Sequence, residues 1–139
     1  MEEPLTEELL DELLNAPDPQ AFIAQAEKHD RTLAGYLQQL LAEKGMKRSE
    51  VVRAAGLNET FGYQIFKGQR RASRNKILQI AFAMGLSLRE TGRLLQSAGA
   101  NGLYCKDRRD AIIIFALDRG LGLQAVEEAL YRYGEETIC

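Results

Sequence analysis

Residues 48–68 of the chain read RSEVVRAAGLNETFGYQIFKG. Apolar residues recur at helical spacing on both sides of Gly56, and glycine takes up left-handed backbone without steric cost. Asn58 is a favoured N-cap for the second of these two segments, which stops at Gly68. The pattern predicts two short helices joined by a tight turn, which is the layout of a helix-turn-helix.

The rest of the chain also has helical spacing, and no stretch alternates apolar and polar residues long enough to predict a strand. Ile112–Phe115 is rich in β-branched residues, but its length and capping favour a buried helix. Asp107 is expected to cap that helix, and Asp110 imitates the second residue of a capping box. The expected helices are an acidic amphipathic one over Leu5–Leu14, a further one over Pro19–Lys28, one from Leu33 that ends at Gly45, Arg48–Ala55, one after Asn58 that ends at Gly68, one after Ser73 that ends at Gly85, Leu88–Ala98, Asp107–Arg119 and Gln124–Tyr133.

Charge is strongly segregated along the chain, although the formal net charge is only −2. Residues 1–30 hold nine acidic residues and one basic residue, a local charge of −8. Residues 44–76 hold nine basic and two acidic residues, a local charge of +7. Attraction to phosphate depends on the local field of a surface patch, so the basic segment is the candidate nucleic-acid contact.

Other classes of function find little support in the sequence. The two cysteines, Cys105 and Cys139, lie far apart without a CxxC motif, and His29 is the only histidine, so we expect no metal site and no cofactor. The longest apolar run, Ala111–Leu117, has seven residues and is too short to cross a bilayer. The acidic amino terminus has the wrong sign for a secretory signal, so a cytoplasmic protein is expected.

A longer string of residues continues the pattern of the first stretch: Ala55-Gly56-Leu57-Asn58, Ile65, Gly68-Gln69-Arg70, Ile77-Leu78 and Ala81, Met84, Gly85, Leu86. This string resembles the Cro/repressor-like XRE family of DNA-binding proteins, over about Leu33 to Leu88. The resemblance implies an all-α, lambda-repressor-like five-helix domain, with helices over roughly 33–44, 48–55, 59–67, 74–84 and 87–97. In such domains the third helix enters the major groove and the second lies over the DNA backbone.

The resemblance also implies a set of DNA contacts. Arg48 and Ser49 open the second helix and would meet phosphate. The base-reading set on the recognition helix would be Glu59, Thr60, Tyr63 and Gln64. Phosphates beyond that helix would be held by Lys67, Arg70, Arg71 and Arg74.

Four residues depart from the family's pattern. Arg48 stands at a usual glutamine, and Lys47 at a usual Ser/Thr cap, which loses a contribution of about 1 kcal/mol. Gly62 replaces a usual aliphatic residue, so Phe61 or Tyr63 beside it is expected to fill the space. Glu59 is an acid in the turn nearest to DNA, where it could accept a hydrogen bond from cytosine, repel phosphate or cap the helix.

The expected organisation is an acidic helical extension over residues 1–30, the helix-turn-helix domain over 31–98 and a C-terminal helical pair over 99–139. The expected function is sequence-specific binding of double-stranded DNA by a homodimer, for transcriptional regulation. The C-terminal pair either forms the dimer surface or completes the core. The alternative is an antitoxin-like or other partner-binding module without DNA binding. The acidic N-terminal helix would then either dock a protein partner or cover the basic surface of its own domain and inhibit it. An enzyme is the weakest option, because no spacing supplies a catalytic pair.

Overall fold

The computed structural model describes residues 14–15, 18–20 and 32–139. The chain divides into two units, Met1–Arg31 and Thr32–Cys139. The acidic extension expected over residues 1–30 lies almost wholly outside the described residues. Within it, Leu14–Asn15 and Pro19–Gln20 are helical.

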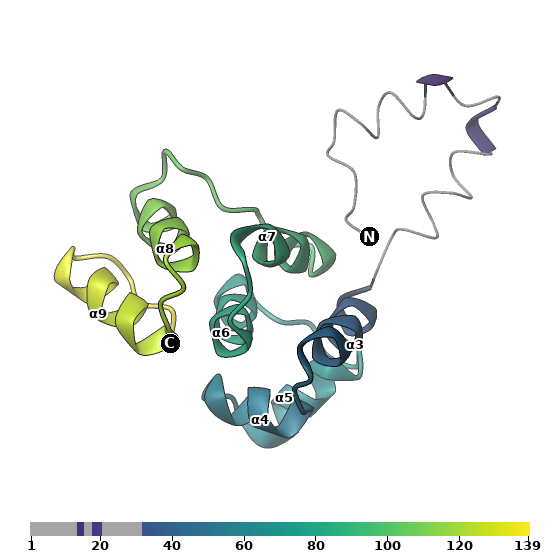
Figure 1. Cartoon of the computed structure of the whole chain (residues 1–139), viewed down its shortest axis with the longest axis horizontal. Coiled ribbons are helices and arrows are strands. Elements are labelled where there is room, and N and C mark those ends of the chain that lie inside the picture. The colour runs from purple at the N-terminus through teal and green to yellow at the C-terminus, as the bar shows by residue number, and fades with distance from the viewer. Residues whose placement is uncertain (1–13, 16–17, 21–31) are drawn as a thin grey trace. The chain divides into compact units, whose positions relative to one another are not determined.

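The described part of the second unit consists of helices and the loops between them, without a strand, as Figure 1 shows. Its helices are α3 (Leu33–Lys44), α4 (Arg48–Ala54), α5 (Glu59–Phe66), α6 (Arg74–Met84), α7 (Leu88–Ser97), α8 (Arg108–Asp118) and α9 (Leu123–Arg132). The predicted all-α class is confirmed, and the helix ends agree with the predicted ones to within a residue. Among the described residues, no helix has the length and hydropathy that a bilayer crossing requires.

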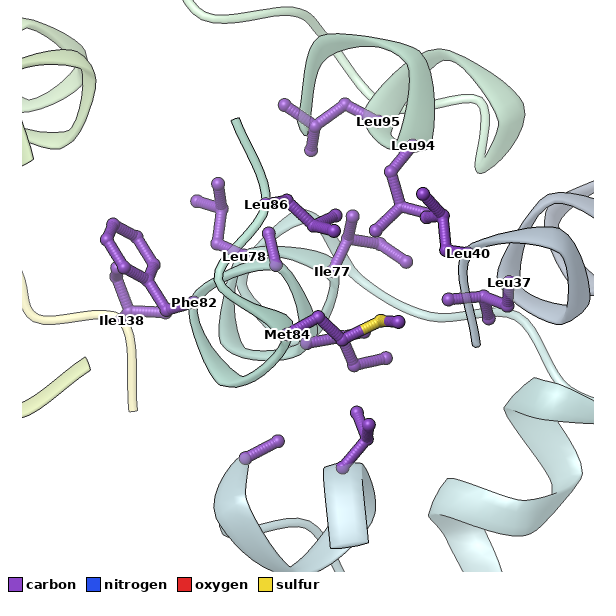
Figure 2. Close-up of a cluster of buried hydrophobic side chains, with 14 of the residues drawn as sticks. Leu37, Leu40, Ile77, Leu78, Phe82, Met84, Leu86, Leu94, Leu95 and Ile138 are labelled. Atoms are coloured by element: carbon purple, nitrogen blue, oxygen red, sulfur yellow. The ribbon is translucent and has the colours of Figure 1, made fainter. Parts of the chain in front are cut away.

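Helix α6 is the centre of the core, and seven of its eleven residues are buried. It packs against α4, α7 and α9. Figure 2 shows Ile77 of α6 facing side chains from α3 and α7, while Phe82 lies beside Ile138 of the C-terminal tail. A helix this buried on most of its circumference ties the helix-turn-helix and the C-terminal helices into one apolar core.

The crossing of α4 and α5 depends on Gly62. A Cβ atom built on Gly62 would lie 2.7 and 2.9 Å from the two Cγ atoms of Val52, well inside van der Waals contact. The expectation that Phe61 or Tyr63 fills the space at Gly62 is therefore wrong, because Val52 of α4 occupies it. The two helices approach closely because one of them has no side chain at the contact.

The C-terminal pair is joined to the start of α6 by two arginine networks. Arg74, the first residue of α6, donates from Nη1 and Nη2 to both carboxylate oxygens of Asp110 in α8, at 2.9 and 2.8 Å. Arg109 donates from Nη2 to Oδ1 of Asn75 at 2.9 Å, and from Nε and Nη2 to the carbonyl oxygens of Glu136 and Thr137. These contacts hold α8 and the C-terminal tail against the first turn of α6.

The capping role expected for Asp107 is present, since its Oδ1 accepts from the backbone N–H of Asp110 at 2.9 Å. The capping box expected from Asp110 is not formed. Its carboxylate turns instead to Arg74 and to the backbone N–H of Tyr104, at 3.0 Å. A bidentate guanidinium partner is a stronger attraction for a buried carboxylate than one backbone N–H of its own helix.

We expect the effect of Gly62→Ala on the free energy of unfolding to change sign when Val52 is shortened to alanine. In the wild-type chain it should lower the free energy of unfolding by about 1–2 kcal/mol, because overpacking outweighs the better helix propensity of alanine. In a Val52→Ala background the two Cγ atoms are absent. There, Gly62→Ala should raise the free energy of unfolding by about 0.5–1 kcal/mol. Urea denaturation of the four proteins measures this, and a loss of equal size in both backgrounds would contradict the proposed contact.

Asp110→Asn should lower stability in a pH-dependent way. Burial alone would raise the pKa of Asp110, but hydrogen bonds from Arg74 and Tyr104 and the charges of Arg74 and Arg109 bring it below its ordinary value. The carboxylate therefore stabilises the fold fully above its unfolded pKa, and this contribution is lost as the pH falls through the folded pKa. We expect a loss of about 2 kcal/mol at neutral pH, and a shallower acid-side decline than in the wild type. Parallel acid-side declines in urea titrations would disprove the role of the charge.

Candidate nucleic-acid interface

Helix α5 presents one polar face outward. Oδ1 of Asn58 accepts from the backbone N–H of Phe61 at 3.0 Å, which fixes where the helix begins. The helix buries Gly62, Ile65 and Phe66. At about 100° per residue, the opposite face carries the four residues of the expected base-reading set. In this set, the exposed residues are Glu59 and Thr60, and the partly exposed ones are Tyr63 and Gln64.

Three basic residues follow directly after this face. Lys67, Arg70 and Arg71 are all exposed. They line one open hollow, together with the start of α3 and the end of α7. Gly68, with a φ of 77°, makes the turn that leads from α5 into this loop. The described residues include no carboxylate paired with any of the three cations.

Arg48 and Ser49 lie at the start of α4, on another side of α5. They share a shallow hollow with Tyr63 of α5 and with Gln38 and Leu41 of α3. The guanidinium carbon of Arg48 lies 4.6 Å from the centre of the Tyr63 ring. A phosphate contact from α4 and a base contact from α5 would therefore be made side by side.

Lys47 gives no side-chain cap to α4, as expected for a lysine at that position. Glu50 compensates in part, since its Oε1 accepts from the backbone N–H of Lys47 at 3.2 Å. The start of α4 is held by this contact in place of the usual Ser/Thr hydroxyl.

Arg74 differs from the other expected phosphate contacts. Four of the five N–H groups of its guanidinium donate within the protein, to Asp110 and to the carbonyl oxygens of Asn101 and Gly102. Its charge is also paired with a carboxylate that is 8% exposed. The structure thus brings nine of the ten expected residues to the surface of α4, α5 and the following loop, and directs Arg74 towards α8.

Two residues shape this surface although the sequence pattern predicted no role for them in it. The Gln79 side chain donates from Nε2 to the carbonyl oxygen of Ala55 at 2.8 Å, so buried α6 holds the end of α4. The signal was a glutamine inside the apolar run Ile77–Ala81. Phe61 is the other, because the guanidinium carbon of Arg70 lies 5.4 Å from its ring centre.

A comparison with known protein families found one family whose model matches part of the chain. Residues 36–90 match the model of the Cro/C1-type HTH DNA-binding domain. No curated protein and no solved structure matches the chain. The matched segment runs from the first turn of α3 into the first turn of α7, and so contains the whole α4–α5 crossing and the basic loop. The chain therefore carries a Cro/C1-type helix-turn-helix domain, as its resemblance to the XRE family implied.

Proposed function

We propose that this protein binds double-stranded DNA at specific sequences and regulates transcription. The observation that carries the proposal is the outward polar face of α5, with the partly exposed Arg48 on one side and the exposed cations of the following loop on the other. A helix in the major groove needs polar side chains towards the base edges and positive charge towards the two phosphate backbones. The family match supports DNA binding by the same element.

Each residue has a role in this proposal. Gln64 can donate to and accept from adenine through its amide, while Glu59 can accept from the amino group of cytosine. Thr60 and Tyr63 complete the base-reading set. The phosphates would be held by Arg48, Ser49, Lys67, Arg70 and Arg71. Arg74 would fix the start of α6, with one N–H group left for a phosphate.

We further propose that a homodimer binds two half-sites about one helical turn apart, because a single recognition helix rarely gives sufficient affinity. The C-terminal pair is the candidate dimer surface. It packs on α6 and α7 and also leaves large apolar side chains exposed. These are Phe115, Leu121, Tyr131 and Tyr133.

Selection from random DNA tests the proposed sequence readout. The wild-type protein should enrich a motif with two half-sites, spaced by about one turn of the duplex. Gln64→Ala should relax one base position in each half-site, with a discrimination loss of about 1–3 kcal/mol at that position, because a bidentate contact to a base edge disappears. Sequencing of the selected pools provides the measurement. An identical motif from both proteins would remove Gln64 from the base-reading set.

Salt dependence tests the phosphate contacts. Arg70→Ala and Arg71→Ala should each weaken binding to all sequences alike, and each should reduce the slope of log K against log salt by about 1. Lys106→Ala removes one positive charge outside the matched segment and serves as the control, with an unchanged slope. Fluorescence anisotropy at several salt concentrations measures the slopes. A slope that is flat already in the wild type would argue against DNA binding.

A further inference from the structure

Two arginines from outside α5 lie over the aromatic rings on either side of Gly62, which are Phe61 and Tyr63. Arg48, at the start of α4, lies over the Tyr63 ring with its guanidinium carbon 4.6 Å from the ring centre. Arg70, in the loop after α5, lies over the Phe61 ring at 5.4 Å. Both distances are within the range in which an aromatic face attracts a cation.

The two arginines lie on different flanks of α5. Residues two apart in an α-helix point about 160° away from each other around its axis. Gly62 between them faces Val52 of α4, so the packed side of α5 separates the two rings. Both rings are partly buried against the core, which fixes their positions and leaves part of each to the arginine.

This arrangement matches the geometry of a major groove. A helix in the groove has one phosphate backbone along each of its sides, and so needs a cation on each flank. A guanidinium stacked on a ring keeps the N–H groups at its edge free for the two oxygens of a phosphate. An arginine already held on a ring also loses less side-chain freedom when it binds.

We propose that Phe61 and Tyr63 are positioning residues, which hold Arg70 and Arg48 ready for phosphates on the two sides of α5. The inference rests on the proposed function, and deepens it by giving Phe61 a role and Tyr63 a second one. Arg71 provides the internal contrast. It is exposed and next to Arg70 in sequence, but in the described part of the chain no ring lies against it.

A double-mutant cycle on DNA affinity tests the proposal. Phe61→Leu should weaken binding about two- to five-fold, the range that corresponds to an exposed cation–π contact. The same change should have no effect in an Arg70→Ala background, and its full effect in an Arg71→Ala background. Phe61→Tyr keeps a ring and should retain wild-type affinity. For the other flank, the effect of Tyr63→Leu is compared in the wild-type and Arg48→Ala backgrounds, because a base contact of Tyr63 is lost equally in both and only the difference reports its contact with Arg48.

Conservative changes of the arginines provide a second measurement that does not touch the core. Arg70→Lys keeps the charge but loses the guanidinium that lies over the Phe61 ring, so binding should weaken while the salt slope stays as in the wild type. Arg71→Lys should leave affinity closer to the wild-type value. In the free protein, the side-chain protons of Arg48 and Arg70 should show ring-current shifts in NMR spectra, which Phe61→Leu removes for Arg70 alone.

The outcomes separate the inference from the proposed function. Absence of DNA binding by the wild-type protein would overturn both. Binding by the wild type with an equal effect of Phe61→Leu in the Arg70→Ala and Arg71→Ala backgrounds would overturn the inference alone. Tighter binding by Phe61→Leu would also overturn it, since the ring would then hold Arg70 away from the phosphate.

Discussion

The close approach of α4 and α5 is the constraint on which the rest of the surface depends. Because Gly62 has no side chain, Val52 can pack directly on the α5 backbone. That contact fixes the position of α5 against α4, and therefore also the direction in which the opposite, polar face of α5 points. The same glycine costs helix propensity of about 1 kcal/mol, which an eight-residue helix tolerates only because its inner face is buried in the core.

The start of α6 is a second place on which the arrangement of the helices depends. Arg74 places a positive charge at a helix amino terminus, where the helix dipole disfavours it. Asp110 lies in the first turn of α8, so its carboxylate faces both this charge and the positive end of its own helix. The pair links the loop that carries Arg70 and Arg71 to the C-terminal helices. The C-terminal pair therefore supports the basic loop whether or not it also forms a dimer surface.

Local signals were sufficient to predict helices α3 to α9, because glycines and capping side chains mark their ends. The outward face of α5 also followed from helical periodicity. The ion pair of Arg74 with Asp110 could not be predicted from periodicity. Asp110 lies 36 residues away in sequence, and its position depends on how α8 packs on the core. Phe61 was named only as a neighbour of Gly62, and its place on this surface was missed for a similar reason. Its contact with Arg70 depends on the path of the chain after Gly68, which apolar spacing does not describe.

The count of basic residues in the segment 44–76 overstates the positive field that a duplex would meet. Lys44 pairs with Glu90 at 3.2 Å, and Arg74 pairs with Asp110. Two of the nine bases are therefore largely neutralised within the fold. The exposed cations that remain on the loop after α5 are Lys67, Arg70 and Arg71. Since screening limits the reach of exposed charges to about 8–10 Å, these neighbours of α5 decide the local attraction to phosphate, more than the net charge of the chain does.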